Sequence, residues 1–214
     1  MTFRDRADAG GQLADELRAF DLDDPVVLAL PRGVPVACQV ASALDAPLEV
    51  FVARKVGAPG HREFGIGAIA EGGGQVADHH ALSRLGVSAE QFDELAAVEQ
   101  RELERRVERY RGDRALPALE HRDVLVVDDG LATGVTAEAA LRALRTRRPR
   151  RLFLAIPACA PTSADRLREV ADEVVCLLEP RNFRAVGEWY EQFDQTTDTE
   201  VVDLLDRARA ATGP

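Results

Sequence analysis

Short runs of apolar residues alternate with amphipathic segments along most of the chain. The run at 26–30, bounded by Pro25 and Pro31, is typical of a strand buried on both faces of a parallel sheet. Such runs predict strands at 26–30, 48–53, 124–127, 152–156 and 173–178. Apolar residues at helical spacing predict helices at 8–20, 35–44, 88–110, 135–145 and 163–171. This alternation predicts an α/β fold with a doubly wound, mostly parallel sheet flanked by helices, whose ligands bind beyond the carboxyl ends of the strands.

One stretch in the first half departs from this rhythm. Residues 56–63 contain two glycines and a proline, which is typical of a loop. We expect a mobile loop at about 56–64 that leads into a hairpin strand. No linker long enough to divide the chain is present, so we expect a single domain over 1–214.

The most informative stretch begins at the strand expected at 124–127. This strand delivers two adjacent carboxylates, Asp128 and Asp129, to its end, and a loop rich in Gly and Thr then leads into a helix. The start of a helix and the backbone N–H groups of such a loop attract a phosphate, to which Thr133 and Thr136 add hydroxyl donors. The carboxylates would repel that phosphate, so they must face hydroxyl groups or a divalent metal ion. A sugar phosphate meets both demands; a simple turn with a helix cap is the alternative.

Residues 124–136 resemble the phosphoribosyl pyrophosphate (PRPP) signature of the type I phosphoribosyltransferases, which has four apolar residues, two acidic residues and a loop rich in Thr and Gly. The resemblance implies the fold of that family. It also implies that Asp128 and Asp129 hold the ribose hydroxyls and, directly or through water, a Mg²⁺ ion. The residues that it assigns to the loop around the 5′-phosphate are Gly130, Ala132, Thr133, Gly134, Val135 and Thr136.

Two further segments resemble cation-bearing parts of the same family. Arg32 and Gly33 follow the first expected strand and resemble the pyrophosphate loop, where backbone N–H groups and Arg donors suit phosphate oxygens. Arg54 and Lys55 end the next strand and resemble the start of the mobile catalytic loop of adenine and orotate phosphoribosyltransferases. An ordinary surface turn and a pair of solvated cations are the alternatives. The expected catalytic residues are Arg32, Arg54, Lys55, Asp128 and Asp129.

The base that would accept the phosphoribosyl group is less defined. Ala132 stands at the loop position where the hypoxanthine-guanine branch of the family has an Asp that interacts with a ring nitrogen of the purine. The C-terminal segment is similar to the hood strand of the purine enzymes, where an aromatic ring stacks on the base. We therefore expect a small hood formed by the chain ends, at about 1–20 and 180–205. The residues expected at the base are Phe183, Val186, Trp189 and Tyr190, unless they pack on the core as a clamp.

The resemblance implies a Mg²⁺-dependent glycosyltransferase of nucleotide metabolism, as in nucleoside salvage. It would move the 5-phosphoribosyl group from PRPP to a purine, a related nitrogenous base or another amine acceptor, and would release pyrophosphate. The cations would stabilise the departing pyrophosphate. The alternative is a regulator of the same fold that senses PRPP without catalysing transfer.

Charge and composition narrow the partners and the compartment. A formal net charge of -10 argues against general nucleic-acid binding, and the Arg run at 145–151 is expected to be a solvated helix end. The three cysteines lack metal-ligand spacing, so we expect reduced thiols and a cytoplasmic location. Without a signal core or an apolar run of about eighteen residues, we expect no membrane partner. We expect a homodimer.

Overall fold

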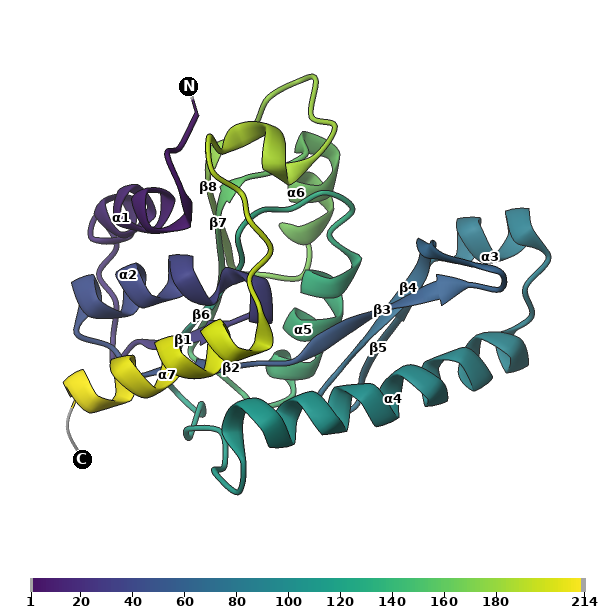
Figure 1. The fold of residues 1–214 in the computed structure, drawn as a ribbon, viewed down its shortest axis with the longest axis horizontal. Helices are drawn as coiled ribbons and strands as arrows, with labels where there is room; N and C mark the ends of the chain where they lie inside the picture. Colours follow the sequence, from purple (N-terminus) through teal and green to yellow (C-terminus); the bar gives the residue numbers. More distant parts are fainter. Residues whose placement is uncertain (1, 213–214) are drawn as a thin grey trace.

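The computed structural model describes residues 2–212, except for the side chains of residues 62, 63 and 212, and Figure 1 shows its fold. The helices are α1 (Arg6–Leu17), α2 (Val34–Leu44), α3 (His79–Leu85), α4 (Ala89–Arg111), α5 (Val135–Arg145), α6 (Pro161–Leu167) and α7 (Asp198–Thr212), with short 3-10 helices η1 (Pro31–Gly33) and η2 (Val186–Trp189). The strands are β1 (Val26–Ala29), β2 (Leu48–Val50), β3 (Ala53–Ala58), β4 (His61–Ala70), β5 (Gly74–Ala77), β6 (Asp123–Val127), β7 (Arg151–Ala158) and β8 (Glu173–Leu178). Over residues 2–212, no helix combines the length and the apolar character that crossing a membrane requires.

Parallel strands in the order β2-β1-β6-β7-β8 form the central sheet. Alternate residues of a strand face opposite sides, so Val27 and Ala29 of β1 pack with α1 and α2, whereas Val26 and Leu28 pack with α5. The predicted doubly wound parallel sheet flanked by helices is therefore confirmed. The chain order reverses at β1, which has β2 on one side and β6 on the other, and ligands of such sheets bind at this switch point.

A second, antiparallel sheet of β3, β4 and β5 forms an arm together with α3 and α4 (Figure 1). The helix α5 packs against both sheets, and Gly74 of β5 approaches it so closely that a Cβ there would lie 2.5 Å from the Ala139 carbonyl oxygen. The stretch expected to be a loop, 56–64, contains the end of β3, the turn and the start of β4. The mobility of this hairpin stays a prediction.

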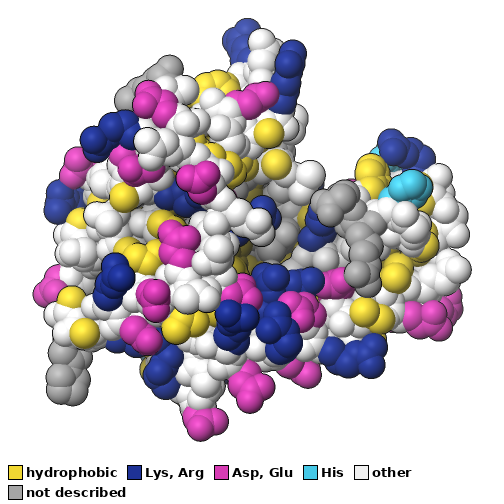
Figure 2. Space-filling model, viewed as in Figure 1, with side chains coloured by type: hydrophobic (Ala, Val, Ile, Leu, Met, Phe, Trp, Pro, Cys, Tyr) yellow, Lys and Arg dark blue, Asp and Glu magenta, His cyan; other side chains and the backbone are white. Residues whose placement is uncertain are grey.

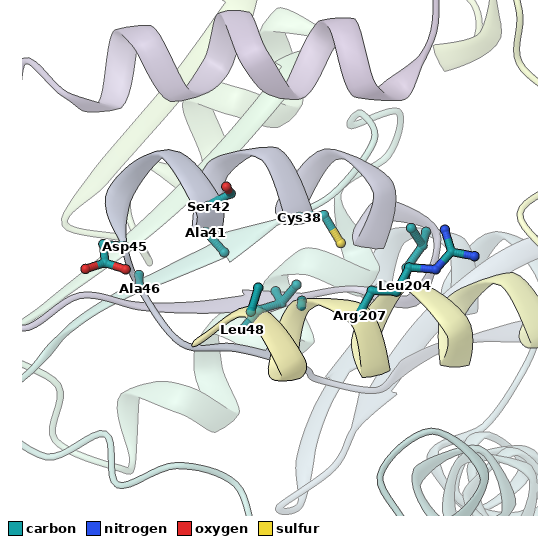
Figure 3. A pocket seen from close by; sticks show the side chains of 10 residues that line it. Cys38, Ala41, Ser42, Asp45, Ala46, Leu48, Leu204 and Arg207 are labelled. Atoms are coloured by element: carbon teal, nitrogen blue, oxygen red, sulfur yellow. The ribbon is translucent and has the colours of Figure 1, made fainter. Parts of the chain in front are cut away.

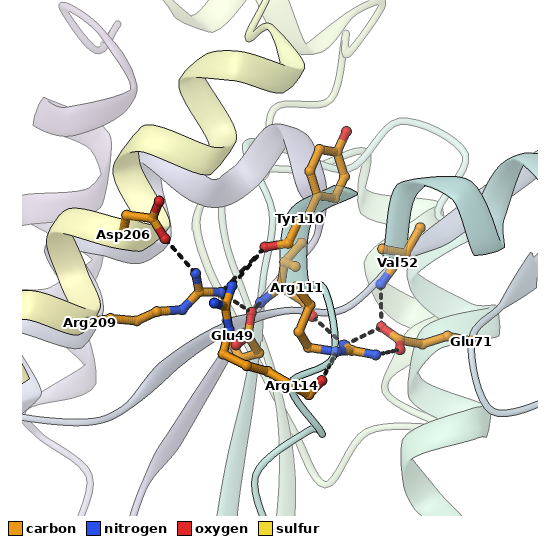
Figure 4. A network of polar contacts seen from close by, with 9 residues as sticks. Glu49, Val52, Glu71, Tyr110, Arg111, Arg114, Asp206 and Arg209 are labelled. Carbon is orange, nitrogen blue, oxygen red and sulfur yellow. Dashed lines mark hydrogen bonds and ion pairs between the residues drawn. The ribbon is translucent and has the colours of Figure 1, made fainter. Parts of the chain in front are cut away.

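The strand expected at 48–53 is interrupted, because the chain leaves the central sheet after Val50 and enters the arm. A buried ion pair holds this junction (Figure 4): Arg111 Nη2 lies 2.5 Å from Glu71 Oε2, and Arg111 Nη1 donates to the Val50 carbonyl oxygen at 3.1 Å. Glu71 Oε1 also accepts a hydrogen bond from the backbone N–H of Val52 at 2.8 Å. Removing one partner would leave a buried charge at a cost of about 3–5 kcal/mol, so the pair fixes the arm to the central sheet.

The N-terminal segment around Phe3 and the segment 183–193 meet in a small cluster, called the chain-end cluster below. Phe3 forms an isolated parallel bridge with Tyr190, and its backbone N–H donates to the Trp189 carbonyl oxygen at 2.8 Å. Other apolar members of this cluster include Phe183, Val186 and Phe193. By contrast, α1 and α7 both pack against α2, so only parts of the segments expected to form a hood lie in this cluster. Its role as a cover for a bound ligand stays a prediction.

Candidate functional site

The loop between β6 and α5 ends at a helix start that no side chain caps. Gly134 has a φ of 73°, a left-handed conformation that glycine adopts without strain. On the α6 side, Ser163 Oγ donates to the Ala132 carbonyl oxygen at 2.6 Å, and the Arg166 guanidinium donates to that of Thr133. These bonds hold the loop in place, while the uncapped N–H groups in the first turn of α5 offer a binding site for an anion.

The predicted 5′-phosphate residues differ in exposure. Ala132 and Thr133 are exposed, Thr136 is half-buried, and Gly130, Gly134 and Val135 are buried. Val186 of η2 covers Gly130, since a Cβ on this glycine would lie 2.5 Å from Val186 Cγ1. The chain-end cluster therefore contacts the PRPP signature directly.

Asp128 follows β6 and is half-buried at the carboxyl end of the central sheet. Its Oδ1 accepts a hydrogen bond from the backbone N–H of Asp129 at 2.9 Å. Burial and then the negative charge of Asp129 raise the pKa of Asp128 to about 7, while Arg32 and Arg6 act in the opposite direction. The carboxylate is thus held where its charged form is disfavoured unless a donor or a cation meets it.

Asp129 has a different environment from the one we expected. Its carboxylate is buried, and its Oδ2 lies 3.0 Å from Arg6 Nε and 2.9 Å from Arg6 Nη2. The carboxylate that we expected to face the ribose and the metal ion is therefore part of an internal ion pair with Arg6. Tyr190 also donates its hydroxyl to the Asp129 carbonyl oxygen at 2.5 Å. Burial raises the pKa of Asp129, and the charge of Arg6 opposes this shift. Contact of Asp129 with the sugar stays a prediction.

Gly33 brings the second predicted loop against the first. A Cβ on Gly33 would lie 2.4 Å from Asp128 Cα and 2.8 Å from the Val127 carbonyl oxygen. Arg32 is exposed beside it, and its charge acts on the pKa of both Asp128 and Asp129. The two loops that sequence reasoning assigned to pyrophosphate and to the 5′-phosphate are therefore in direct contact.

Arg54 and Lys55 lie on β3, where neighbouring residues point to opposite faces. Arg54 turns towards α4, where its Nη2 lies 2.5 Å from Glu99 Oε2 and its Nη1 lies 3.8 Å from Glu102 Oε1. Lys55 is exposed, and its side chain lies over Gly65 of β4, whose Cβ would be 2.8 Å from Lys55 Cδ. The adjacent cations therefore do not act as one group in this arrangement, and their contact with pyrophosphate stays a prediction.

The three predicted base-binding aromatics, Phe183, Trp189 and Tyr190, lie in two different settings. Tyr190 is buried, and its ring centroid lies 5.5 Å from that of Phe3, so it packs the chain ends together. Phe183 and Trp189 are half-buried, with ring centroids 6.4 Å apart and planes inclined by 17°. Among the residues that the structure describes, Trp189 Nε1 is buried without a hydrogen-bond partner. Binding of a base at these rings stays a prediction.

A separate cavity lies between α2 and α7 (Figure 3). It has a volume of about 290 Å³ and is lined by Cys38, Leu48, Leu204 and Arg207 among others, none of them a predicted site residue. The other two cysteines lie together, Cys159 directly after β7 and Cys176 on β8, with their Sγ atoms 2.6 Å apart and both free. Glu179 lies beside them and pairs with Arg168 at 2.6 Å.

The Arg run at 145–151 is paired with acidic residues rather than only solvated. Arg145 lies 2.8 Å from Asp172, and Arg150 and Arg151 lie 2.7 Å and 2.6 Å from the buried Asp123. On the face shown in Figure 2, basic and acidic side chains are interspersed. This internal pairing lowers the positive potential that the run could offer to a nucleic acid.

The fold and the two loops at its switch point define a class of protein: the chain belongs to the phosphoribosyl transferase domain family, whose model matches residues 5–194. The crystal structure of TT1426 from Thermus thermophilus is similar to it, with 44% sequence identity and a TM-score of 0.80, over 96% of this chain and 98% of that one.

A curated relative agrees with this assignment, and a more distant solved structure shares the fold. The Mycobacterium tuberculosis H37Rv protein Rv0571c, which carries a provisional phosphoribosyl transferase name, is 44% identical over 207 residues. That match covers 96% of this chain and 47% of the relative, so the chain spans about half the length of the curated relatives it matches. A hypothetical protein from Neisseria gonorrhoeae with bound ppGpp, 14% identical over 98% of this chain and 99% of that one, shares the fold at a TM-score of 0.52.

Proposed function

We propose that this chain binds PRPP with Mg²⁺ and transfers its 5-phosphoribosyl group to a nitrogenous base, releasing pyrophosphate. The contact between the two loops at the switch point of the sheet carries this proposal. The uncapped start of α5 would bind the 5′-phosphate, and the loop of Arg32 and Gly33 would bind the pyrophosphate. Asp128 lies between these loops, where the ribose that joins the two phosphate groups would lie.

In this reaction the base nitrogen forms a bond to carbon 1 of the ribose and gives up its proton to the solvent, and the bond to pyrophosphate breaks with its electron pair leaving on pyrophosphate. Positive charge builds on the sugar ring and negative charge on the leaving group. Asp128 would accept hydrogen bonds from the ribose hydroxyls, and Arg32 would face the departing pyrophosphate. The carboxylate of the half-buried Asp128 is an oxygen ligand of the kind that Mg²⁺ prefers. When bound, the ion would neutralise part of the charge on the pyrophosphate oxygens.

Arg54 and Lys55 provide a matched pair for the leaving-group role. We expect Lys55→Ala to lower the rate of pyrophosphate release about tenfold to a hundredfold while PRPP affinity changes less, because a cation that meets developing charge acts mainly in the transition state. Arg54→Ala should in addition lower the melting temperature, because Arg54 pairs with Glu99 and Glu102. Steady-state kinetics with both variants would measure this, and parent-like turnover in both would contradict the leaving-group role.

A regulator that senses PRPP without turnover is the second candidate, and the position of Arg54 favours it, because Glu99 and Glu102 engage one predicted leaving-group cation. Calorimetry with PRPP and Mg²⁺, followed by pyrophosphate release over purine, pyrimidine and nicotinate bases, separates the two. Turnover with any base supports the transferase, and binding without turnover over the whole panel supports the regulator. If PRPP does not bind, both proposals are wrong.

We also propose a cytoplasmic location, which the three free cysteines support, because thiols stay reduced in that compartment. We further propose that the protein forms a homodimer, and light scattering would test this by measuring its molar mass in solution.

A further inference from the structure

Arg6 is a buried cation whose guanidinium contacts a carboxylate, a backbone carbonyl oxygen and an aromatic ring. Two of its nitrogens, Nε and Nη2, lie within 3.0 Å of Asp129 Oδ2, and Nη1 donates to the Asp194 carbonyl oxygen at 2.8 Å. The guanidinium carbon lies 3.9 Å from the centroid of the Phe193 ring, in the geometry of a cation–π contact. One side chain thus joins the acidic pair of the PRPP signature to the C-terminal segment.

Two contacts of the N-terminal segment hold Arg6 in this place. Phe3 is fully buried and bridges to Tyr190. Asp5, immediately before Arg6, caps α1 by accepting a hydrogen bond from the Asp8 N–H at 2.8 Å. Arg6 is the first residue of α1, so the cap and the bridge together fix the direction in which its side chain leaves the backbone.

Two adjacent carboxylates present a problem for a ligand that carries several negative charges. Asp128 and Asp129 would together repel PRPP, although one carboxylate is enough to accept hydrogen bonds from the ribose hydroxyls. The buried ion pair cancels one of the two charges and turns Asp129 into the interior. Asp128 has no such side-chain partner among the described residues and is the more exposed of the two.

We infer that Arg6 is a positioning residue for PRPP: by binding Asp129 it leaves Asp128 as the carboxylate that faces the sugar and lowers the repulsion of the anionic ligand. This inference rests on the proposed function, because it concerns binding at the same site. It differs from the role implied by the family resemblance, in which both acidic residues hold the ribose.

The test is a double-mutant cycle on the full chain, with PRPP affinity measured by calorimetry in Mg²⁺ and melting temperature measured separately. We expect Arg6→Met to weaken PRPP binding about tenfold or more, because it leaves the charge of Asp129 uncompensated. Arg6→Lys keeps the charge and should recover part of that loss. The neutral pair Arg6→Met with Asp129→Asn removes both charges, and its affinity should recover to within about threefold of the parent.

Arg209 supplies a matched control, because its Nη2 lies 2.8 Å from Oε1 of the buried Glu49, on α7 and β2, away from both loops. Arg209→Met should lower the melting temperature without weakening PRPP binding. If affinity instead falls with stability in both Arg6→Met and Arg209→Met, the loss reflects stability alone and the inference is overturned. It is also overturned if Arg6→Met binds like the parent, or if the double variant stays as weak as Arg6→Met, since Asp129 would then contact PRPP itself. If the parent binds no PRPP, the proposed function fails; if only the variants depart from expectation, the inference alone fails.

Discussion

Replacement of Asp128 by Asn is expected to weaken PRPP binding about a hundredfold, because hydrogen bonds to a charged group contribute about 1.5–3 kcal/mol and about 1.4 kcal/mol is a factor of ten in affinity. Asn has almost the same shape, but it loses the charge that would attract a metal ion and replaces one acceptor oxygen by a donor. Calorimetry of the parent and of Asp128→Asn in the presence of Mg²⁺ measures this difference.

The same substitution should not destabilise the protein. Burial and the charge of Asp129 raise the pKa of Asp128 to about 7, so the ionised form is disfavoured in the folded chain without ligand. We therefore expect the melting temperature of Asp128→Asn at pH 8 to equal or exceed that of the parent, because a neutral side chain avoids this repulsion. A weaker affinity with an unchanged melting temperature identifies a ligand contact. Unchanged affinity would show that Asp128 does not hold the sugar.

The parts of the site that sequence reasoning located are those contained in one contiguous segment or at neighbouring strand ends. Asp128 and the loop up to Thr136 follow a single buried strand, so the chain itself fixes their proximity. The contact of Gly33 with Asp128 follows from β1 and β6 being parallel neighbours, whose carboxyl ends must lie at the same edge. For these residues, the order of strands and loops along the sequence was enough to predict that they lie close together.

The remaining contacts join residues that are far apart in the sequence, and no local pattern predicts that they meet. Arg6 and Asp129 are 123 positions apart, and the only local signal at Arg6 is its place at the start of a helix. Cys159 and Cys176 meet because β7 and β8 are neighbours, although their spacing matches no ligand motif.

Arg54 and Lys55 lie in a strand that the sequence pattern did not predict. We expected them at the end of the strand at 48–53, but they lie on β3, which runs from Ala53 to Ala58. Its alternation therefore sends their side chains to opposite faces.

Gly33→Ala offers the second large effect, and it tests whether the spacing of the two loops matters. The backbone of Gly33, with φ of -82° and ψ of -3°, is open to any residue, so only space opposes a side chain here. The added Cβ would lie 2.4 Å from Asp128 Cα and 2.9 Å from the Asp128 carbonyl carbon, and both atoms are backbone. The β1–α2 loop and the start of the β6–α5 loop must therefore move apart.

We expect Gly33→Ala to lower stability by about 1–3 kcal/mol, as overpacking does, with a fall in melting temperature of roughly 2–4 °C per kcal/mol. PRPP affinity should fall by at least about tenfold, because a ligand held at both phosphate ends depends on the distance between the loops. Gly11→Ala is the control, since its Cβ in α1 would meet nothing within 4 Å, and a helical Ala should leave stability unchanged or raise it by up to about 1 kcal/mol. Parent-like binding by Gly33→Ala would mean that PRPP does not bridge these loops, and the site would then have to lie on the β6–α5 side alone.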